Sequence, residues 1–266
     1  MLTMDEKYRF EDFGLICEVG HEHPLTPVFE RKTLAIPGRA GLWDFGTEIR
    51  EKPFNFPMGI IDMDRMELQN KLNLFNDFLF DPFGQPRVIK IVFDYEPDKF
   101  YLVKCRETIS PERIIHAGRF TLPFVADNPY KQFIVQSDEI KWESDIPIIS
   151  DITWFSGEDN FEIKSPQTIE VRNDGNLIVR PRVLINGTAT SLTLTLNGES
   201  FSFGSISKQI ELNADFYVVK VNGLERLTTM TGNLEKFYLM PGTNQIVFNG
   251  SNLDLQITFE FYNRYK

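Results

Sequence analysis

Four Asn-Gly pairs in the second half of the chain constrain its fold more than any other feature. They are Asn186-Gly187, Asn197-Gly198, Asn222-Gly223 and Asn249-Gly250, and they stand between short runs in which apolar and polar residues alternate. Both residues of such a pair tolerate positive φ, so Asn-Gly between alternating runs is a strong signal for a tight β-hairpin. The pattern predicts a hairpin turn at each pair.

The alternating runs around these turns predict about eight to ten short strands. The runs are residues 167–172, 177–185, 190–196, 199–203, 209–212, 216–221, 245–248 and 253–262. Even spacing with turn signals is typical of an antiparallel β-sandwich or jelly roll. No strand–helix–strand alternation is present, which argues against a parallel nucleotide-binding sheet.

The first half contains one predicted helix, over about residues 64–80. Its apolar positions follow helical spacing at Met66, Leu68, Leu72, Phe75 and Leu79, and Phe78 widens the stripe. Asp64 is the predicted N-cap and Glu67 completes a capping-box pattern. Pro82 ends the helix because proline cannot continue its hydrogen-bond ladder.

The rest of the first half is strand-like. Residues 54–60 and 120–126 alternate apolar and polar side chains, and residues 87–94 and 99–106 form two β-rich runs that predict a hairpin. The chain has 24 Phe, a strand former, which also favours a mainly β fold. Residues 21–48, rich in Pro and Gly, are interpreted as a long excursion such as a hairpin arm, since long loops in compact domains are usually functional or disordered.

An acidic segment at residues 136–166 is the predicted domain boundary, which gives domains 1–135 and 136–266. Trp142 and Trp154 lie in this segment. They could seal a seam between the domains or form a platform for a sugar ring, and the seam is the favoured interpretation.

Charge and composition exclude several function classes. The chain has 28 Lys and Arg against 38 Asp and Glu, a net charge of −10, which disfavours general nucleic-acid binding. No apolar run approaches the roughly 20 residues that span a bilayer, and residues 1–13 carry no secretory signal pattern. We expect Cys17 and Cys105 to be buried, reduced thiols, as in a protein made in a reducing cytosol.

The sequence offers little catalytic chemistry. His21-Glu22-His23 is the one histidine cluster, but it lies in a Pro-rich stretch with no Cys or third His close by, so a metal site is disfavoured. No GxSxG, HExxH or phosphate-binding Gly-rich motif is present. Paired carboxylates for glycoside hydrolysis stay open by counting alone, although surface carboxylates are the favoured interpretation. We therefore predict no catalytic, cofactor or metal site, and no enzyme activity.

Several motifs occur in an order that is familiar from one family. Ile36-Pro37-Gly38-Arg39-Ala40-Gly41 comes early, and the first domain closes on the segment from Gly118 to Tyr130, which ends in Asp127-Asn128-Pro129-Tyr130. The second domain adds Val171 to Asn176, Pro181, Ile185-Asn186-Gly187 and Leu239 to Ile246. Over nearly its whole length the chain resembles the siphophage distal tail (Dit) proteins, in their compact form without an inserted carbohydrate-binding module.

The resemblance implies a structural role in a phage or prophage tail rather than catalysis. It implies an N-terminal domain that builds a homohexameric ring at the distal end of a long non-contractile tail, and a galectin-like C-terminal sandwich that projects outward. The implied partners are the tail tube protein, the tail-tip protein and receptor-binding proteins, with no specific nucleic-acid binding and no membrane insertion. The implied location is the virion, after synthesis in the cytoplasm of a Gram-positive host.

Two other functions stay open beside the tail hub. The first is a carbohydrate-binding module fused to an adaptor domain, which the sandwich and its Trp residues favour. The second is a glycoside hydrolase of the jelly-roll type, which would require a functional pair of carboxylates. Both rank below the hub because a fold alone does not establish a function.

Overall fold

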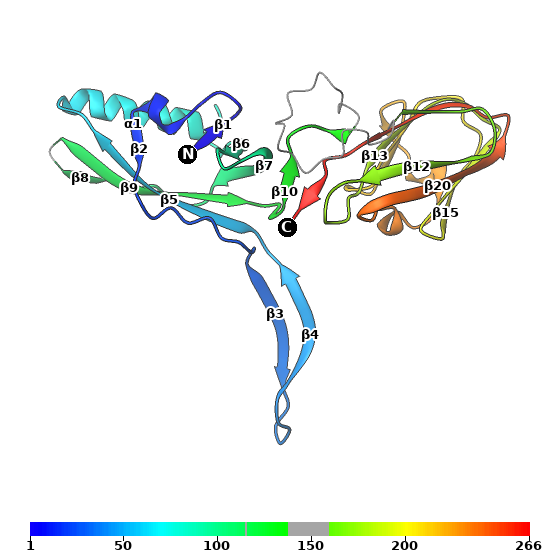
Figure 1. Ribbon diagram of the computed structural model, residues 1–266, viewed down its shortest axis with the longest axis horizontal. Helices are drawn as coiled ribbons and strands as arrows, with labels where there is room; N and C mark the ends of the chain where they lie inside the picture. Colours follow the sequence, from blue (N-terminus) through cyan, green and yellow to red (C-terminus); the bar gives the residue numbers. More distant parts are fainter. Residues whose placement is uncertain (115, 138–159) are drawn as a thin grey trace. The chain divides into compact units, whose positions relative to one another are not determined.

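The computed structural model describes residues 1–114, 116–137 and 160–266, which form a mainly β protein with one α-helix among them, as predicted (Figure 1). The chain divides into two compact units, Met1–Lys131 and Gln132–Lys266. Most of the predicted acidic segment, with Trp142 and Trp154, lies outside the described residues, so the seam and the sugar platform stay predictions.

The N-terminal unit holds one long antiparallel sheet, a hairpin and the helix. Its elements are β1 (Leu2–Met4), η1 (Phe10–Phe13), β2 (Leu15–Cys17), β3 (Phe29–Ala35), β4 (Leu42–Ile49), β5 (Lys52–Ile61), α1 (Arg65–Leu79), β6 (Ile89–Phe93), β7 (Glu96–Cys105), β8 (Glu112–Ile114) and β9 (Ala117–Ala126). The sheet order is β1-β6-β7-β9-β5-β2, with β8 paired to β9. The hairpin predicted from residues 87–94 and 99–106 is β6–β7.

Alternation along β5 and β9 builds the core of this unit. Phe54, Phe56, Met58 and Ile60 all point to the buried face, as predicted, and α1 and η1 cover that face (Figure 1). Much of the core is aromatic, with ring pairs such as Phe10 on Phe75 and Phe56 on Phe124, so many of the phenylalanines pack against one another. Aromatic pairs add to the stabilisation from buried apolar area.

The helix forms almost where the sequence placed it. Asp64 is the N-cap, but its carboxylate accepts from the backbone N–H of Met66 at 2.8 Å rather than from that of Glu67, so the predicted capping box is wrong in detail. Leu68, Phe75 and Leu79 are buried as predicted. Met66, which the apolar stripe included, is 75% exposed, although Leu68 in the same turn is buried.

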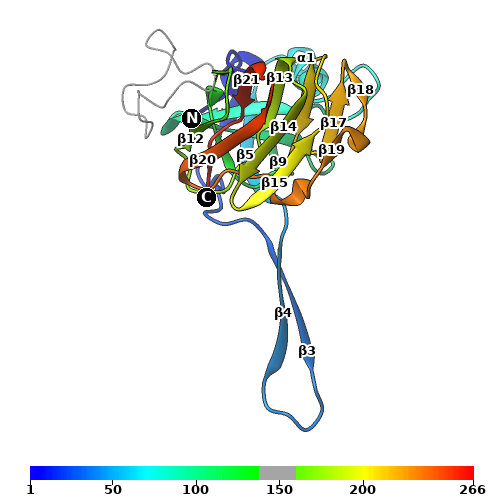
Figure 2. The same ribbon diagram turned by 90° about the vertical axis from the view of Figure 1, so that its right-hand side faces the viewer.

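The C-terminal unit is an antiparallel sandwich of two sheets around one apolar core (Figure 2). One sheet has the order β11-β21-β13-β16-β17-β18 and the other β12-β20-β14-β15-β19. The strands and short helices are β11 (Asn160–Ile163), β12 (Gln167–Asn173), β13 (Arg182–Thr188), β14 (Ser191–Leu196), β15 (Glu199–Phe203), β16 (Ile210–Asn213), β17 (Val218–Val221), β18 (Leu224–Glu225), η3 (Leu227–Thr229), β19 (Met230–Thr231), η4 (Leu234–Lys236), β20 (Gly242–Ser251) and β21 (Asp254–Glu260). A short pair, β10 (Lys131–Phe133) with β22 (Arg264–Tyr265), joins the two ends of this unit.

Only two of the four Asn-Gly pairs make the predicted turns. Asn197-Gly198 and Asn222-Gly223 connect β14 to β15 and β17 to β18, with positive φ at all four residues. The other two pairs lie inside β13 and β20, so a hairpin turn there is wrong.

The two pairs that lie inside strands contain glycine for a different reason. A Cβ at Gly187 would lie 2.1 Å from the Asp254 carbonyl oxygen, and one at Gly250 would lie 2.1 Å from the Ser191 carbonyl oxygen. Glycine stands in both strands because neighbouring backbone comes too close for any side chain. The turn after β20 falls instead at Ser251-Asn252, where Asn252 has a φ of 52°.

Candidate assembly surfaces

The excursion predicted at residues 21–48 is a hairpin arm formed by β3 and β4. The arm, which we define as residues 28–51, stands away from the rest of its unit (Figures 1 and 2). Every residue of β3 is exposed, as are nearly all those of β4. A two-stranded ribbon alone is marginally stable at best, so we expect this arm to pack on another chain when the protein is assembled.

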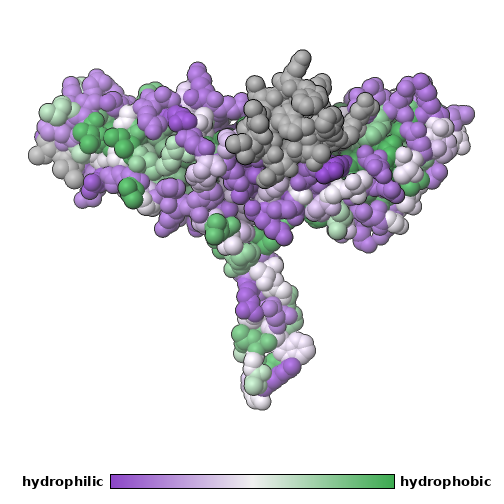
Figure 3. Space-filling model, viewed as in Figure 1, coloured by the Kyte–Doolittle hydropathy of each residue, from purple (hydrophilic) through white to green (hydrophobic). Residues whose placement is uncertain are grey.

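Apolar side chains lie along the arm without covering from their own unit (Figure 3). Phe29 pairs with Ile49 near the base, and Leu34 pairs with Trp43 toward the tip. Leu34 and Trp43 are 53% and 47% exposed. Exposed apolar patches of this kind mark interaction surfaces in soluble proteins.

Ion pairs hold the two strands of the arm together between these apolar rows. Arg31 pairs with Asp44 at 2.9 Å, and Lys32 and Arg50 both contact Glu48. A hydrogen bond from the Gly46 N–H, with the Arg31 guanidinium, lowers the pKa of Asp44, and the Lys32 ammonium lowers the pKa of Glu48. Exposed pairs contribute little to stability, so they fix the register of the ribbon more than they stabilise it.

The Ile36–Gly41 motif of the family resemblance is the tip of the arm. Gly38 and Gly41 have φ of 80° and 87°, in the left-handed region that favours glycine. The Arg39 guanidinium lies 4.6 Å from the centre of the Trp43 ring. The sequence pattern of this motif is therefore explained by the turn that reverses the arm.

His23 and Lys52 lie before and after the arm in the sequence. At the base of the arm they come together among the rings of Phe93, Tyr95 and Tyr101, which we call the aromatic box. The His23 ring stacks on Phe93 at 4.5 Å between ring centres, and its Nδ1 contacts the Tyr95 hydroxyl. Lys52 is only 2% exposed and its Nζ donates to the Tyr101 hydroxyl at 2.9 Å.

Both side chains at the base of the arm have altered acid–base properties. Burial, with the nearby Lys52 charge, lowers the pKa of His23 to about 4. Burial, with the charge of Lys131, lowers the pKa of Lys52 to about 8. The box therefore favours the neutral form of both groups.

The neutral His23 predicts a loss of stability in acid. An unfolded histidine has a pKa near 6.5, so the unfolded chain binds more protons than the folded chain between pH 6.5 and 4. The stabilisation is complete above pH 6.5 and is lost as the pH falls to 4. With solvent screening at this partly buried ring, we expect the loss to be about 1–2 kcal/mol. Urea unfolding at a series of pH values should show this loss in the unchanged chain and not in His23→Phe.

The matched control for this prediction is His21→Phe. His21 also stacks on a phenylalanine, Phe56, at 6.4 Å between ring centres, but it is exposed. We expect His21→Phe to keep the acid loss of the unchanged chain. An acid loss of equal size in His23→Phe would show that another group carries it.

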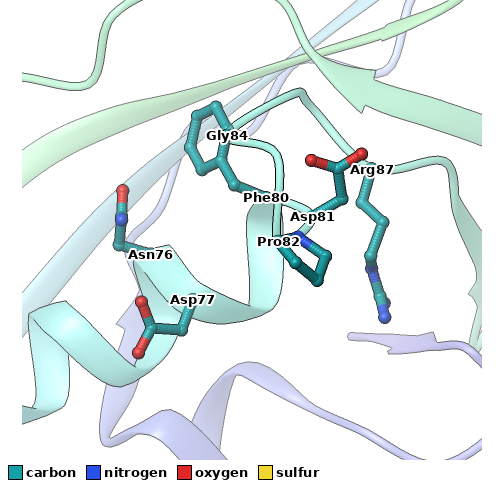
Figure 4. Close-up of a pocket in the computed structure, with 7 residues that line it drawn as sticks. All are labelled: Asn76, Asp77, Phe80, Asp81, Pro82, Gly84 and Arg87. Atoms are coloured by element: carbon teal, nitrogen blue, oxygen red, sulfur yellow. The ribbon is translucent and has the colours of Figure 1, made fainter.

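A second surface follows the end of α1. Residues Asn76, Asp77, Phe80, Asp81, Pro82, Gly84 and Arg87 line a hollow of about 770 Å³ (Figure 4). The Asp81 carboxylate accepts from the N–H groups of Phe83 and Gln85 at 2.9 and 2.8 Å, which folds the loop tightly. Phe83 is left 88% exposed at this loop, and no sequence pattern indicated it.

The residues considered for chemistry do not come together into a site. His21 and His23 stack on different phenylalanines, and the Glu22 carboxylate accepts from the Asn55 amide at 2.7 Å. Within the described ranges, no group of three metal-ligating side chains lies together. Cys17 and Cys105 are both free thiols, Cys105 buried and Cys17 partly exposed, so the prediction that both are buried holds for Cys105. No helix in the part of the chain that the structure describes is long and apolar enough to cross a membrane.

Comparison with known proteins gives a match for most of the N-terminal unit. Residues 8–126, which include the arm, match the family model of the phage tail protein RIFT-related domain. Comparison with curated proteins gave no match. Residues 8–126 thus match a domain of phage tail proteins, a family that points to a structural rather than an enzymatic role.

A solved structure extends the likeness to the whole chain. The crystal structure of SPP1 Dit, described as a paradigm of the hub adsorption apparatus in phages that infect Gram-positive bacteria, superposes with a TM-score of 0.66 at 13% identity over 98% of this chain and 99% of that one. The phage P2 baseplate in its activated conformation with Ca aligns with a TM-score of 0.37 at 9% identity, over 96% of this chain and 93% of that chain. The predicted resemblance to the siphophage distal tail proteins is confirmed by the family match over residues 8–126 and by the fold that the chain shares with SPP1 Dit.

Proposed function

We propose that this tail protein closes into a homohexameric ring that joins the tail tube to the tail-tip and receptor-binding proteins. The arm supports this proposal most directly, because its apolar side chains are left exposed by their own unit. An arm on one face and a separate receiving surface on another make a head-to-tail contact, and such contacts give rings when the rotation closes. In this proposal the N-terminal unit builds the ring and the C-terminal unit carries the outward contacts.

The proposal assigns the apolar rows of the arm to a neighbouring copy of the chain. Every copy of the chain carries both an arm and a receiving surface, so each copy can bind the next one in a head-to-tail ring. A ring also explains why ion pairs fix the ribbon's register in advance, since a preformed arm loses less conformational freedom on docking. The proposed role needs no catalytic group.

The mass of the protein in solution tests the ring. Light scattering over a concentration series should give a species of about 185 kDa, six times the 30.9 kDa of one chain. A strict monomer at all concentrations would contradict ring closure by this chain alone. Negative-stain images of the large species should then show sixfold symmetry, and any other symmetry would overturn the hexamer.

A further inference from the structure

The outer face of one sheet of the C-terminal sandwich carries a polar groove at one end. The groove, which we call the amide groove, has a volume of about 560 Å³ and is lined by Asn160, Glu162, Asn186, Gly187, Asp254, Leu255 and Gln256. These residues come from β11, β13 and β21. Volumes of about 300–1,000 Å³ are typical of small-molecule sites.

Strand register places three polar side chains of the groove in one row. Gln256 on the central strand pairs with Glu162 on one side and with Asn186 on the other. Directly opposed residues on one face of a sheet lie side by side, and two strand spacings cover about 10 Å. The row therefore presents a carboxylate and two amides along a length that matches one or two sugar rings.

The two amides of the row differ from Arg182, further along the same face, in having no partner among the described residues. Elsewhere on the face, Arg182 binds Glu211 at 3.0 Å and Glu260 at 2.6 Å. The side chains of Asn186 and Gln256 make no hydrogen bond to any residue within 1–114, 116–137 or 160–266. The amides of Asn186 and Gln256 are thus available to a ligand at the hollowed end of the face.

We propose that the amide groove binds a neutral, hydroxyl-rich saccharide. A side-chain amide offers a donor and an acceptor in one plane, which matches neighbouring hydroxyl groups that each donate and accept. Glu162 and Asp254 add acceptors for further hydroxyls. This function goes beyond the ring and is independent of whether the ring closes.

The charges at the groove select against other ligands. Glu162 and Asp254 face Lys164, whose ammonium pairs with Glu162 at 2.6 Å, so the net local charge is negative and disfavours phosphorylated or acidic glycans. The groove lining is mostly polar and offers no apolar pocket for the side-chain anchors that peptides use. A neutral saccharide satisfies the free amides without either penalty.

An array of neutral and anionic oligosaccharides, probed with the full chain, tests this inference. We expect binding to at least one neutral oligosaccharide and a loss of at least tenfold in Asn186→Ala/Gln256→Ala. The control is Lys220→Ala, on β17 of the same sheet but outside the groove, which should bind as the unchanged chain does. All variants are compared at the same oligomeric state, so a failure of ring closure leaves the result readable.

Three outcomes would overturn the saccharide site. The first is no binding to any neutral oligosaccharide. The second is binding only to anionic oligosaccharides or only to a protein. The third is binding to a neutral oligosaccharide that the double variant keeps. If the double variant does not keep the unfolding midpoint of the unchanged chain, Gln256→Ala alone replaces it, because that side chain is exposed on the central strand. Unchanged binding in that single variant would count equally against the proposal.

Discussion

A chain that carries Leu34→Ser and Trp43→Ser is expected to run as a monomer at concentrations where the unchanged chain forms the large species. The two side chains are cross-strand partners on the arm and half-exposed in the free chain. Buried aromatic and aliphatic anchors at interfaces contribute about 2 kcal/mol or more each, so the pair shifts the assembly midpoint by roughly 10³-fold in concentration. Light scattering and analytical ultracentrifugation would measure the shift.

The matched control removes two apolar side chains from the other unit that are even more exposed than those of the arm. Phe216→Ser and Leu224→Ser lie in the C-terminal unit, where the two residues are 74% and 64% exposed. We expect this control to assemble as the unchanged chain does, and both double variants to keep the unfolding midpoint. A large species that persists in the arm variant would show that the arm does not carry assembly.

Gly187→Ala is expected to destabilise the C-terminal sandwich severely. Gly187 has a φ of 125°, and an added Cβ would lie 2.1 Å from the Asp254 carbonyl oxygen, in the pairing of β13 with β21. Backbone strain and the displaced strand together cost about 3–5 kcal/mol. For a unit of this size that lowers the melting temperature by roughly 10–20 °C, which thermal unfolding followed by circular dichroism would detect.

Gly198→Ala is the comparison that isolates the close backbone approach. Gly198 belongs to another Asn-Gly pair and has a φ of 80°, but its missing side chain faces open space. The substitution then costs about 1–2 kcal/mol, from the left-handed backbone alone. Equal losses of stability in the two variants would mean that the close approach to Asp254 contributes nothing to the destabilisation.

The same two glycines show where a local sequence pattern is sufficient and where it is not. The Asn-Gly signal describes backbone freedom, and it predicted the turns at Asn197 and Asn222 because freedom is all that those turns need. At Gly187 and Gly250 the glycine is required by a strand that is distant in sequence. A pattern read along one strand contains no information about the carbonyl of its neighbour.

The helix and the inner strands could be predicted because burial acts on every residue of a periodic element. Phe75 and Leu79 on α1, and Phe54 and Phe56 on β5, are buried as their periodicity indicated. Met66 is an exception, because it is exposed although it fits the same helical spacing. The aromatic box around His23 was also out of reach, since its members come from four separate segments.

The arm was predicted as an excursion, but its apolar rows could not be assigned to a surface from the sequence. Phe29, Leu34 and Trp43 are residue types that are equally common in buried strands, so the sequence does not separate a docking surface from a core. Only the structure shows that nothing in their own unit covers them. The amide groove is likewise invisible in sequence, because its three aligned polar side chains lie on strands brought together by the fold.

Because the residues of the arm contribute so little to the packing of their own unit, selection for folding and selection for assembly act on different parts of this chain. In the proposed ring, a substitution on the arm leaves the core of its unit intact and changes only how well the arm fits its docking surface. The arm can therefore change in step with that surface over many generations without a cost in stability. Lineages of tails could in this way become unable to mix subunits while every subunit still folds.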